Sequence, residues 1–166
     1  GEDLDKYINA GITTDHECGN YEEAVEKISK GMKIQIREGS AARDFDSLYR
    51  LIDEYPDHVM LCSDDKHPDD LIKGHINKLV QKGIEKGLDL FNLLKASIVN
   101  PVYHYNLPVG LLKEKDPADF IVVNDLKRFE ILKTYIDGEE VFNANESAIQ
   151  ITNSDYPNIM NARKID

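Results

Sequence analysis

The sequence is poor in basic residues and in long apolar runs, and each shortage excludes a class of protein. Twenty Lys and Arg residues stand against thirty-one Asp and Glu residues in a chain of 166, giving a formal net charge of -11. A surface of this sign repels phosphate backbones, so no nucleic-acid partner is expected. No apolar stretch approaches the roughly 18 residues that cross a bilayer, and the acidic first residues are unlike a signal peptide. We therefore expect no membrane partner and a cytoplasmic location.

Cysteine is also scarce. Cys18 and Cys62 are far apart in the sequence, and neither belongs to a Cys-x-x-Cys pair, which excludes a disulfide framework and a thiolate zinc site. We expect both to be reduced thiols. The remaining composition, 41% hydrophobic and 31% charged, is that of one globular protein with enough apolar material for a sizeable core.

The first half of the sequence alternates between strand-like and helix-like segments. Strands are predicted at residues 12–14, 32–37 and 58–62 from alternating or continuous apolar patterns. Helical spacing of apolar residues predicts helices over 3–10, 20–31, 45–52, 68–80 and 88–99, the last ending at Asn100-Pro101. Strands that are each followed by a helix predict a parallel sheet. Three such units are too few for a closed barrel, so the pattern predicts part of a larger fold.

The second half has a different pattern. Residues 120–123 and 131–136 are strand-like, and Asp137-Gly138 is the dipeptide of a tight two-residue hairpin. This half is therefore predicted to be antiparallel. From Asn143 onward the chain is polar and rich in Asn, which indicates a linker or a weakly ordered extension.

Polar loops follow all three predicted parallel strands, at the sheet end where α/β proteins bind ligands. They are Asp15-His16-Glu17, Arg37 to Ser40 and Ser63 to His67. An imidazole with a carboxylate suits Zn(II), Mn(II) or Fe(II), which makes His16 and Asp64 candidate metal ligands. A catalytic site needs three or more protein ligands, however, and no His-x-His or His-Glu-x-x-His motif is present. The candidate site is incomplete as it stands.

Other candidate groups have simpler interpretations. Cys62 closes an apolar strand, so packing is favoured over a nucleophilic role for Cys62 or Ser63. His75 is predicted on the apolar side of the helix over 68–80, as a hydrogen-bonded structural histidine. His67 precedes the first helical residue and could either cap that helix or reach into the site. The acidic pair Asp69-Asp70 suits a helix N-terminus and is placed outside the site.

Three segments resemble successive signature segments of bacterial adenine deaminases, metal-dependent members of the amidohydrolase superfamily. They are GITTDHE at 11–17, IREGSA at 36–41 and CSDDKHPDDL at 62–71. Further similarity lies at residues 74–80, 95–101 and 118–123, and the likeness spans about residues 2–142. The resemblance implies an α/β fold in three parts. Residues 1–105 would be the last part of a TIM-like (β/α)8 barrel, residues 106–142 part of a small β-sandwich, and residues 143–166 a polar extension.

The resemblance also implies an activity, the hydrolysis of adenine to hypoxanthine and ammonia in purine salvage. His16 would be a metal ligand, and Asp64 would contact both the metal and its water and move the proton of that water. The cofactor would be Mn(II) or Fe(II), with Zn(II) as an alternative. Residues in the same loops would bind the purine, with Glu38 as the hydrogen-bonding partner of its ring. This substrate-binding set is Arg37, Glu38, Ser40 and Asp65. The groups expected to support the metal ligands are Glu17, His67 and His75.

The family pattern places a His-x-His motif and further ligands before Gly1. We therefore expect a carboxyl-terminal portion of the enzyme that is inactive alone, and that pairs with itself or with the missing amino-terminal part through exposed strand edges. Two alternatives stay open: a non-catalytic α/β scaffold or binding domain, and an amidohydrolase acting on another cyclic amide or purine. Only an adenine deaminase predicts ammonia release from free adenine.

Overall fold

A parallel sheet of three strands lies at the centre of the larger part of the chain. The structure is a computed structural model that describes residues 1–144, 146–150, 157 and 159. The strands run in the order β1-β2-β3, and their bounds are Thr14–Asp15, Lys33–Arg37 and Val59–Cys62. Both pairings are parallel, with Arg37 opposite Cys62 at the carboxyl ends of β2 and β3. The predicted parallel sheet is confirmed, with β1 slightly later in the chain than expected.

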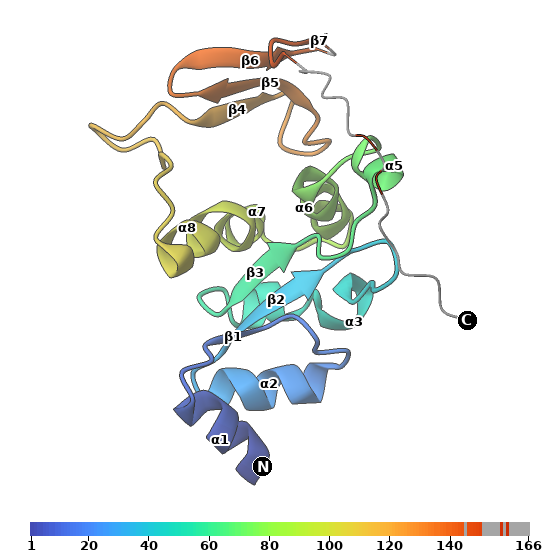
Figure 1. Cartoon of the computed structure of the whole chain (residues 1–166), viewed down its shortest axis with the longest axis vertical. Helices are drawn as coiled ribbons and strands as arrows, with labels where there is room; N and C mark the ends of the chain where they lie inside the picture. Colours follow the sequence, from blue (N-terminus) through green and yellow to red (C-terminus); the bar gives the residue numbers. More distant parts are fainter. Residues whose placement is uncertain (145, 151–156, 158, 160–166) are drawn as a thin grey trace.

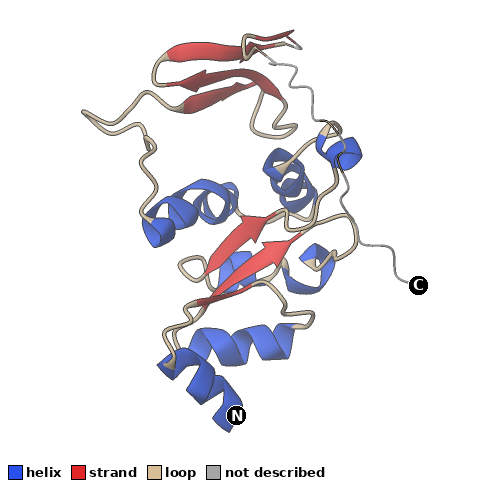
Figure 2. Ribbon diagram, in the orientation of Figure 1, coloured by secondary structure: helices blue, strands red, loops and turns tan. Residues whose placement is uncertain are grey.

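Helices cover the sheet and separate it from a second sheet (Figure 1). α1 and α2 lie at one end of the molecule, while α6, α7 (Leu90–Leu94) and α8 (Asn100–Tyr105) lie between the two sheets (Figures 1 and 2). Asn20 caps α2 by accepting a hydrogen bond from the backbone N–H of Glu23 at 2.9 Å, as predicted. The helices of the first part are α1 Glu2–Asn9, α2 Tyr21–Ser29, α3 Phe45–Leu48, α4 Leu51–Glu54, α5 Pro68–Leu71 and α6 Ile76–Glu85.

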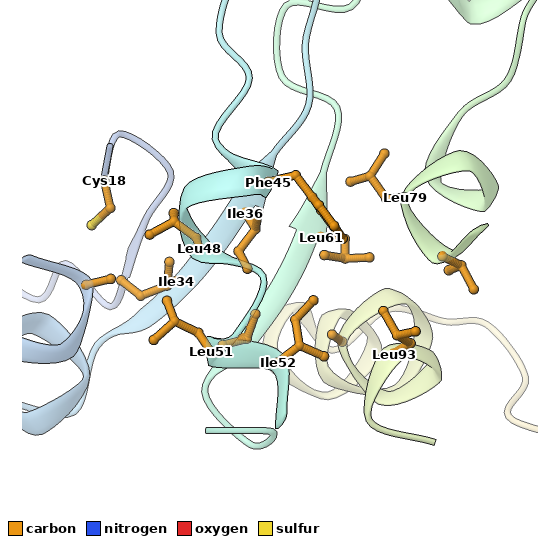
Figure 3. Close-up of a cluster of buried hydrophobic side chains, with 14 of the residues drawn as sticks. Cys18, Ile34, Ile36, Phe45, Leu48, Leu51, Ile52, Leu61, Leu79 and Leu93 are labelled. Carbon is orange, nitrogen blue, oxygen red and sulfur yellow. The ribbon is translucent and has the colours of Figure 1, made fainter. Parts of the chain in front are cut away.

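One hydrophobic core joins the parallel sheet to its helices (Figure 3). Ile34 and Ile36 alternate inward along β2, whereas Lys33, Gln35 and Arg37 occupy the other face, as the two-residue period of a strand requires. Other side chains of the same core come from α3, α4, β3, α6 and α7. They include Phe45, Leu48, Leu51, Ile52, Leu61, Leu79 and Leu93, all buried.

Two predicted helices are each interrupted. The helix predicted over 45–52 is divided into α3 and α4, because the Tyr49-Arg50 turn tightens to i→i+3 hydrogen bonds (Ile52 N–H to Tyr49 O, 3.1 Å). The helix predicted over 68–80 is wrong, because Gly74 adopts φ +139°, a conformation that no α-helix contains. This break changes the direction of the chain between α5 and α6, and it leaves the apolar side chain of Ile72 88% exposed.

The helix predicted to end at Asn100-Pro101 continues past it. α7, Leu90–Leu94, leads into a π-helical segment, Lys95–Val99, and then into α8, Asn100–Tyr105. The wider π turn accommodates Pro101, which lacks an N–H and would clash with the preceding turn of a regular α-helix. It also places Asn100 in the core, where its amide donates hydrogen bonds to the carbonyls of Pro56 and Val59, both at 2.7 Å. The predicted helix end is therefore wrong.

The second sheet is antiparallel, as predicted, with strands in chain order. Its strands are β4 Phe120–Val123, β5 Ile131–Ile136, β6 Glu139–Asn143 and β7 Glu146–Ser147. Asp137 and Gly138 both have positive φ, 50° and 81°, the conformation of the predicted two-residue hairpin. β7 lies in the predicted polar extension, and most of the rest of that extension is outside the described residues. Within the described part of the chain, no helix is long and apolar enough to cross a bilayer.

Candidate functional site

Three loops bring their polar side chains together at the carboxyl ends of the parallel strands. His16 Nε2 lies 3.9 Å from Asp64 Oδ1 and 3.5 Å from Glu17 Oε1. Arg37 Nη1 lies 3.0 Å from Glu17 Oε1 and 3.2 Å from Asp64 Oδ2. The four residues come from segments that follow β1, end β2 and follow β3. The parallel register therefore assembles the predicted pair, His16 and Asp64, with Glu17 and Arg37 beside it.

Arg37 connects this cluster to the rest of the fold. Its side chain is only 12% exposed, and its Nε donates to Asp44 Oδ2 at 2.6 Å. Its Nη1 faces Glu17 and Asp64, so one guanidinium contacts three carboxylates. The hydrogen bond with Asp44 and the pairing with Glu17 raise the pKa of Arg37 above its ordinary value, so its charge is fixed. A fixed cation in this position holds the Asp64 carboxylate in one orientation.

The donor set fits a divalent cation. Metal bonds from nitrogen or oxygen ligands are about 2.0–2.2 Å long, so two ligands of one ion lie about 3 to 4 Å apart. The His16 Nε2 to Asp64 Oδ1 separation of 3.9 Å is within this span. Because Asp64 uses Oδ2 for Arg37, its Oδ1 is the oxygen that faces His16. Imidazole nitrogen with carboxylate oxygen is the donor chemistry of Zn(II), Mn(II) and Fe(II).

The loop of Asp64 is held in an uncommon backbone conformation. Asp64 has φ 45°, in the left-handed region that Asp enters more readily than most residues. The next residue, Asp65, accepts a hydrogen bond from the backbone N–H of Ala41 at 3.2 Å. A Cβ on Gly39 would lie 1.9 Å from Asp65 Oδ1 and 3.2 Å from the Ser63 carbonyl oxygen. The loops after β2 and β3 approach this closely only because residue 39 is glycine.

Two of the expected purine-binding residues lie apart from Arg37. Glu38 accepts hydrogen bonds from Lys82 Nζ at 3.0 Å and from the Phe45 backbone N–H at 3.4 Å. It occupies the opposite face of the strand from Arg37, because successive residues of a strand point to opposite sides. Ser40 donates to Asp70 Oδ2 at 2.6 Å and accepts from the His67 backbone N–H at 2.9 Å. Glu38 and Ser40 therefore lie outside the cluster of His16, Asp64 and Arg37.

The two histidines after β3 lie on either side of α5. His75 is not on the apolar face of a helix, because the break at Gly74 places it just before α6. There His75 Nε2 lies 2.9 Å from Ser63 Oγ. Burial, with a smaller effect from the charge of Lys66, lowers the pKa of His75, which favours its neutral form. His67 precedes α5, but its side chain forms no capping hydrogen bond. The cap alternative for His67 is therefore excluded.

Sequence reasoning missed a second cluster of polar side chains, whose residues lie near His16 in the sequence. Ligand atoms of Asp15, Cys18 and Glu23 all lie within 4.8 Å of one another. The Lys27 ammonium already occupies this cluster, 2.7 Å from Asp15 Oδ2 and 2.6 Å from Glu23 Oε1. A bound cation is therefore not needed to neutralise it. Asp44, the partner of Arg37, was missed as well, and its only sequence signal is an acidic residue directly before a predicted helix.

Together, the parallel βα units and the His and Asp groups at the strand ends define an α/β protein with a candidate site at the carboxyl end of its parallel sheet. Comparison with known proteins agrees, since the sequence profile of the amidohydrolase family matches residues 2–141, and the chain belongs to that family. Among solved structures, the β-aspartyl dipeptidase of Fervidobacterium islandicum AW-1 is similar, with a TM-score of 0.65 and 25% identity. The alignment covers 80% of this chain and 37% of the dipeptidase.

Curated relatives give a more specific likeness. The chain is 60% identical to the adenine deaminase of Methanosarcina barkeri and 52% identical to that of Salinibacter ruber, in each case over 99% of its own length. It spans 30% of the length of each relative. The similarity to adenine deaminases that the signature segments indicated is confirmed.

Proposed function

We propose that this chain is part of an adenine deaminase, which hydrolyses adenine to hypoxanthine and ammonia with a divalent metal. The observation that carries the proposal is the convergence of His16 and Asp64 at 3.9 Å, in a chain 60% identical to an adenine deaminase. The alternatives are a non-catalytic scaffold and an amidohydrolase of another cyclic amide or purine. A scaffold has no need for a fixed guanidinium that orients a carboxylate toward an imidazole.

The proposed architecture is the last part of a (β/α)8 barrel followed by part of a small β-sandwich. In support, β1 and β3 each pair on one side only among the described residues, so both can extend the sheet. The parallel order β1-β2-β3, with a helix after each strand, is the repeating unit of such a barrel. The same open edges support pairing with further chain segments or with another copy.

His16 and Asp64 would hold the metal, proposed to be Mn(II) or Fe(II), with Zn(II) as an alternative. When bound, a divalent cation makes water a better nucleophile at neutral pH. Asp64 would accept the proton of the attacking water and pass it to the departing amine of adenine. Hydroxide adds to C6 of adenine, and the C6–N bond breaks to give hypoxanthine and ammonia. Arg37 keeps Asp64 oriented for this transfer through its contact with Oδ2.

Two ligands are fewer than the three or more of a catalytic metal site. We therefore expect the 166-residue chain alone to release no ammonia from adenine. The other purine-contacting groups proposed here are Arg37, Ser40, Asp65 and Glu38, the last of which would first have to leave Lys82. Glu17 and His75 would support the site, Glu17 through its contacts with His16 and Arg37.

A chimera tests this proposal. Residues 1–166 replace the matching part of the Methanosarcina barkeri adenine deaminase, and ammonia release from adenine is measured with Mn(II). We expect an active chimera, and a loss of about a hundredfold or more with Asp64→Asn because the proton carrier is removed. Asp69→Asn, the same substitution at a residue of α5 outside the cluster, is the matched control and should leave activity unchanged. A chimera that binds Mn(II) and leaves adenine intact would contradict the proposed substrate.

A further inference from the structure

A cationic cavity lies between the loop after β2, α5 and the first turns of α6. Its volume is about 290 Å³, at the lower end of the range for small-molecule sites. Five basic side chains line it, against the two carboxylates of Glu38 and Asp70. The basic residues are Arg43, Lys66, Lys73, Lys78 and Lys82. The chain as a whole has a net charge of -11, so the positive charge of this cavity lining is opposite in sign to that of the whole chain.

Both carboxylates of the cavity are already neutralised. Glu38 pairs with Lys82 at 3.0 Å and Asp70 with Lys73 at 2.8 Å. Hydrogen bonds from Lys73 and Ser40, with the charge of Arg43, lower the pKa of Asp70 to about 2. Three other basic side chains also line the cavity. In the described part of the chain, none of them has a carboxylate oxygen within 4.0 Å. They are Arg43, Lys66 and Lys78.

The break at Gly74 shapes this cavity. With φ +139° the chain turns between α5 and α6, so that both helices contribute to one wall. The Lys78 side chain crosses directly over the Gly74 backbone, where a Cβ would lie 2.4 Å from Lys78 Cγ. Residue 74 therefore has two reasons to be glycine, its dihedral angle and the passage of Lys78. The stem of Lys78 lies against the Gly74 backbone, and the residue lines the cavity.

We propose that this cavity binds a small oxyanion of the phosphate class, held by Arg43, Lys66 and Lys78. Lys and Arg are the side chains that recognise such oxyanions, Lys as a point charge and Arg through paired donors. The three unpaired cations come from three segments, which can surround one tetrahedral anion. The ligand would be either free phosphate or the phosphate group of a nucleotide. The site goes beyond the proposed deaminase, because adenine carries no anionic group.

Calorimetric titration of the 166-residue chain tests the site, with inorganic phosphate in one arm and uridine monophosphate in the other. Uridine monophosphate lacks adenine, so binding at the proposed deaminase site does not contribute. Low ionic strength is needed, because salt screens partly exposed charges. We expect saturable binding that is about tenfold weaker in Lys66→Gln and in Lys78→Gln. Lys127→Gln removes an exposed cation that lies outside the cavity, and it should bind like the parent chain.

The two arms separate the sources of the ligand. Tighter binding of the nucleotide indicates a phosphate ester, and equal or tighter binding of inorganic phosphate indicates the free anion. The site is disproved by an absence of saturable binding in both arms. It is equally disproved if Lys127→Gln weakens binding as much as Lys66→Gln and Lys78→Gln, since that pattern reflects only overall charge. Circular dichroism of each variant confirms that the fold is retained.

Discussion

Arg37 Nη1 lies 3.2 Å from Asp64 Oδ2, across the carboxyl ends of β2 and β3. This contact leaves Asp64 Oδ1 facing His16 Nε2. The two oxygens of one carboxylate therefore face two different groups, a guanidinium and an imidazole. The position of the Arg37 guanidinium is in turn fixed by its contact with the Asp44 carboxylate. The orientation of the candidate metal ligand therefore depends on a chain of contacts that begins in the loop before α3.

Replacing Arg37 should destabilise the fold as well as the site. Arg37→Ala leaves Asp44, a carboxylate only 17% exposed, without its charged partner. Because these groups retain some contact with solvent, we expect a loss of about 2 kcal/mol in the free energy of unfolding. Urea denaturation measures this. Arg50→Ala breaks a pair whose Arg side chain is 63% exposed and should cost no more than about 0.5 kcal/mol. Equal losses in the two variants would contradict the structural role of Arg37.

Gly39 allows the loops after β2 and β3 to approach each other. In Gly39→Ala the new methyl group would overlap Asp65 Oδ1, so the Asp65 side chain must swing away and release the Ala41 N–H. We expect faster amide hydrogen exchange at Ala41 and a stability loss of about 1 to 2 kcal/mol. Gly19→Ala is the matched control, because nothing lies within 4 Å of a Cβ at that position. If amide hydrogen exchange at Ala41 is unchanged in Gly39→Ala, the loops after β2 and β3 are not packed tightly against each other at residue 39.

The strands were predictable from sequence, whereas the interruptions of the helices were not. The alternation along 32–37 and the apolar run at 58–62 depend only on which faces are buried, and burial patterns are local. Gly74 and Pro101 were both present in the sequence, but their effects depend on tertiary context. Gly74 interrupts its helix by adopting φ +139° where the Lys78 side chain crosses its backbone, and Pro101 is tolerated because a π turn precedes it.

The candidate site was predictable to the extent that it depends on topology. Parallel strands present their carboxyl ends at one edge, which was enough to bring His16, Arg37 and Asp64 together from three loops. Side-chain pairing was not predictable, because it depends on which face of β2 each residue occupies. Glu38 follows Arg37 directly and is therefore on the other face, paired with Lys82, a residue 44 positions later.

Burial should make the thiol of Cys18 unreactive. Burial, with the hydrogen bond to Asp15, raises the pKa of Cys18 to about 12 from its ordinary value of 9.0. At pH 8 we expect Cys18 to react with a thiol reagent at least about a hundredfold more slowly in the native chain than in urea. Below pH 9 the thiol is protonated in both states. Between pH 9 and 12 the unfolded chain loses its proton first, so stability falls as the pH rises. Cys18→Ala should remove this part of the alkaline decline.

Asn100 should be a main determinant of stability in the π-helical region. Its buried amide donates to the carbonyls of Pro56 and Val59, which ties the helix to both ends of the turn before β3. Asn100→Ala leaves these carbonyls without that donor, and we expect a loss of about 2 to 3 kcal/mol in the free energy of unfolding with an unchanged denaturant slope. Asn143→Ala removes an amide that donates to Glu140 at the surface, and its effect should stay within about 0.5 kcal/mol. If the two variants unfold at the same urea concentration, the buried bonds of Asn100 do not secure the π turn.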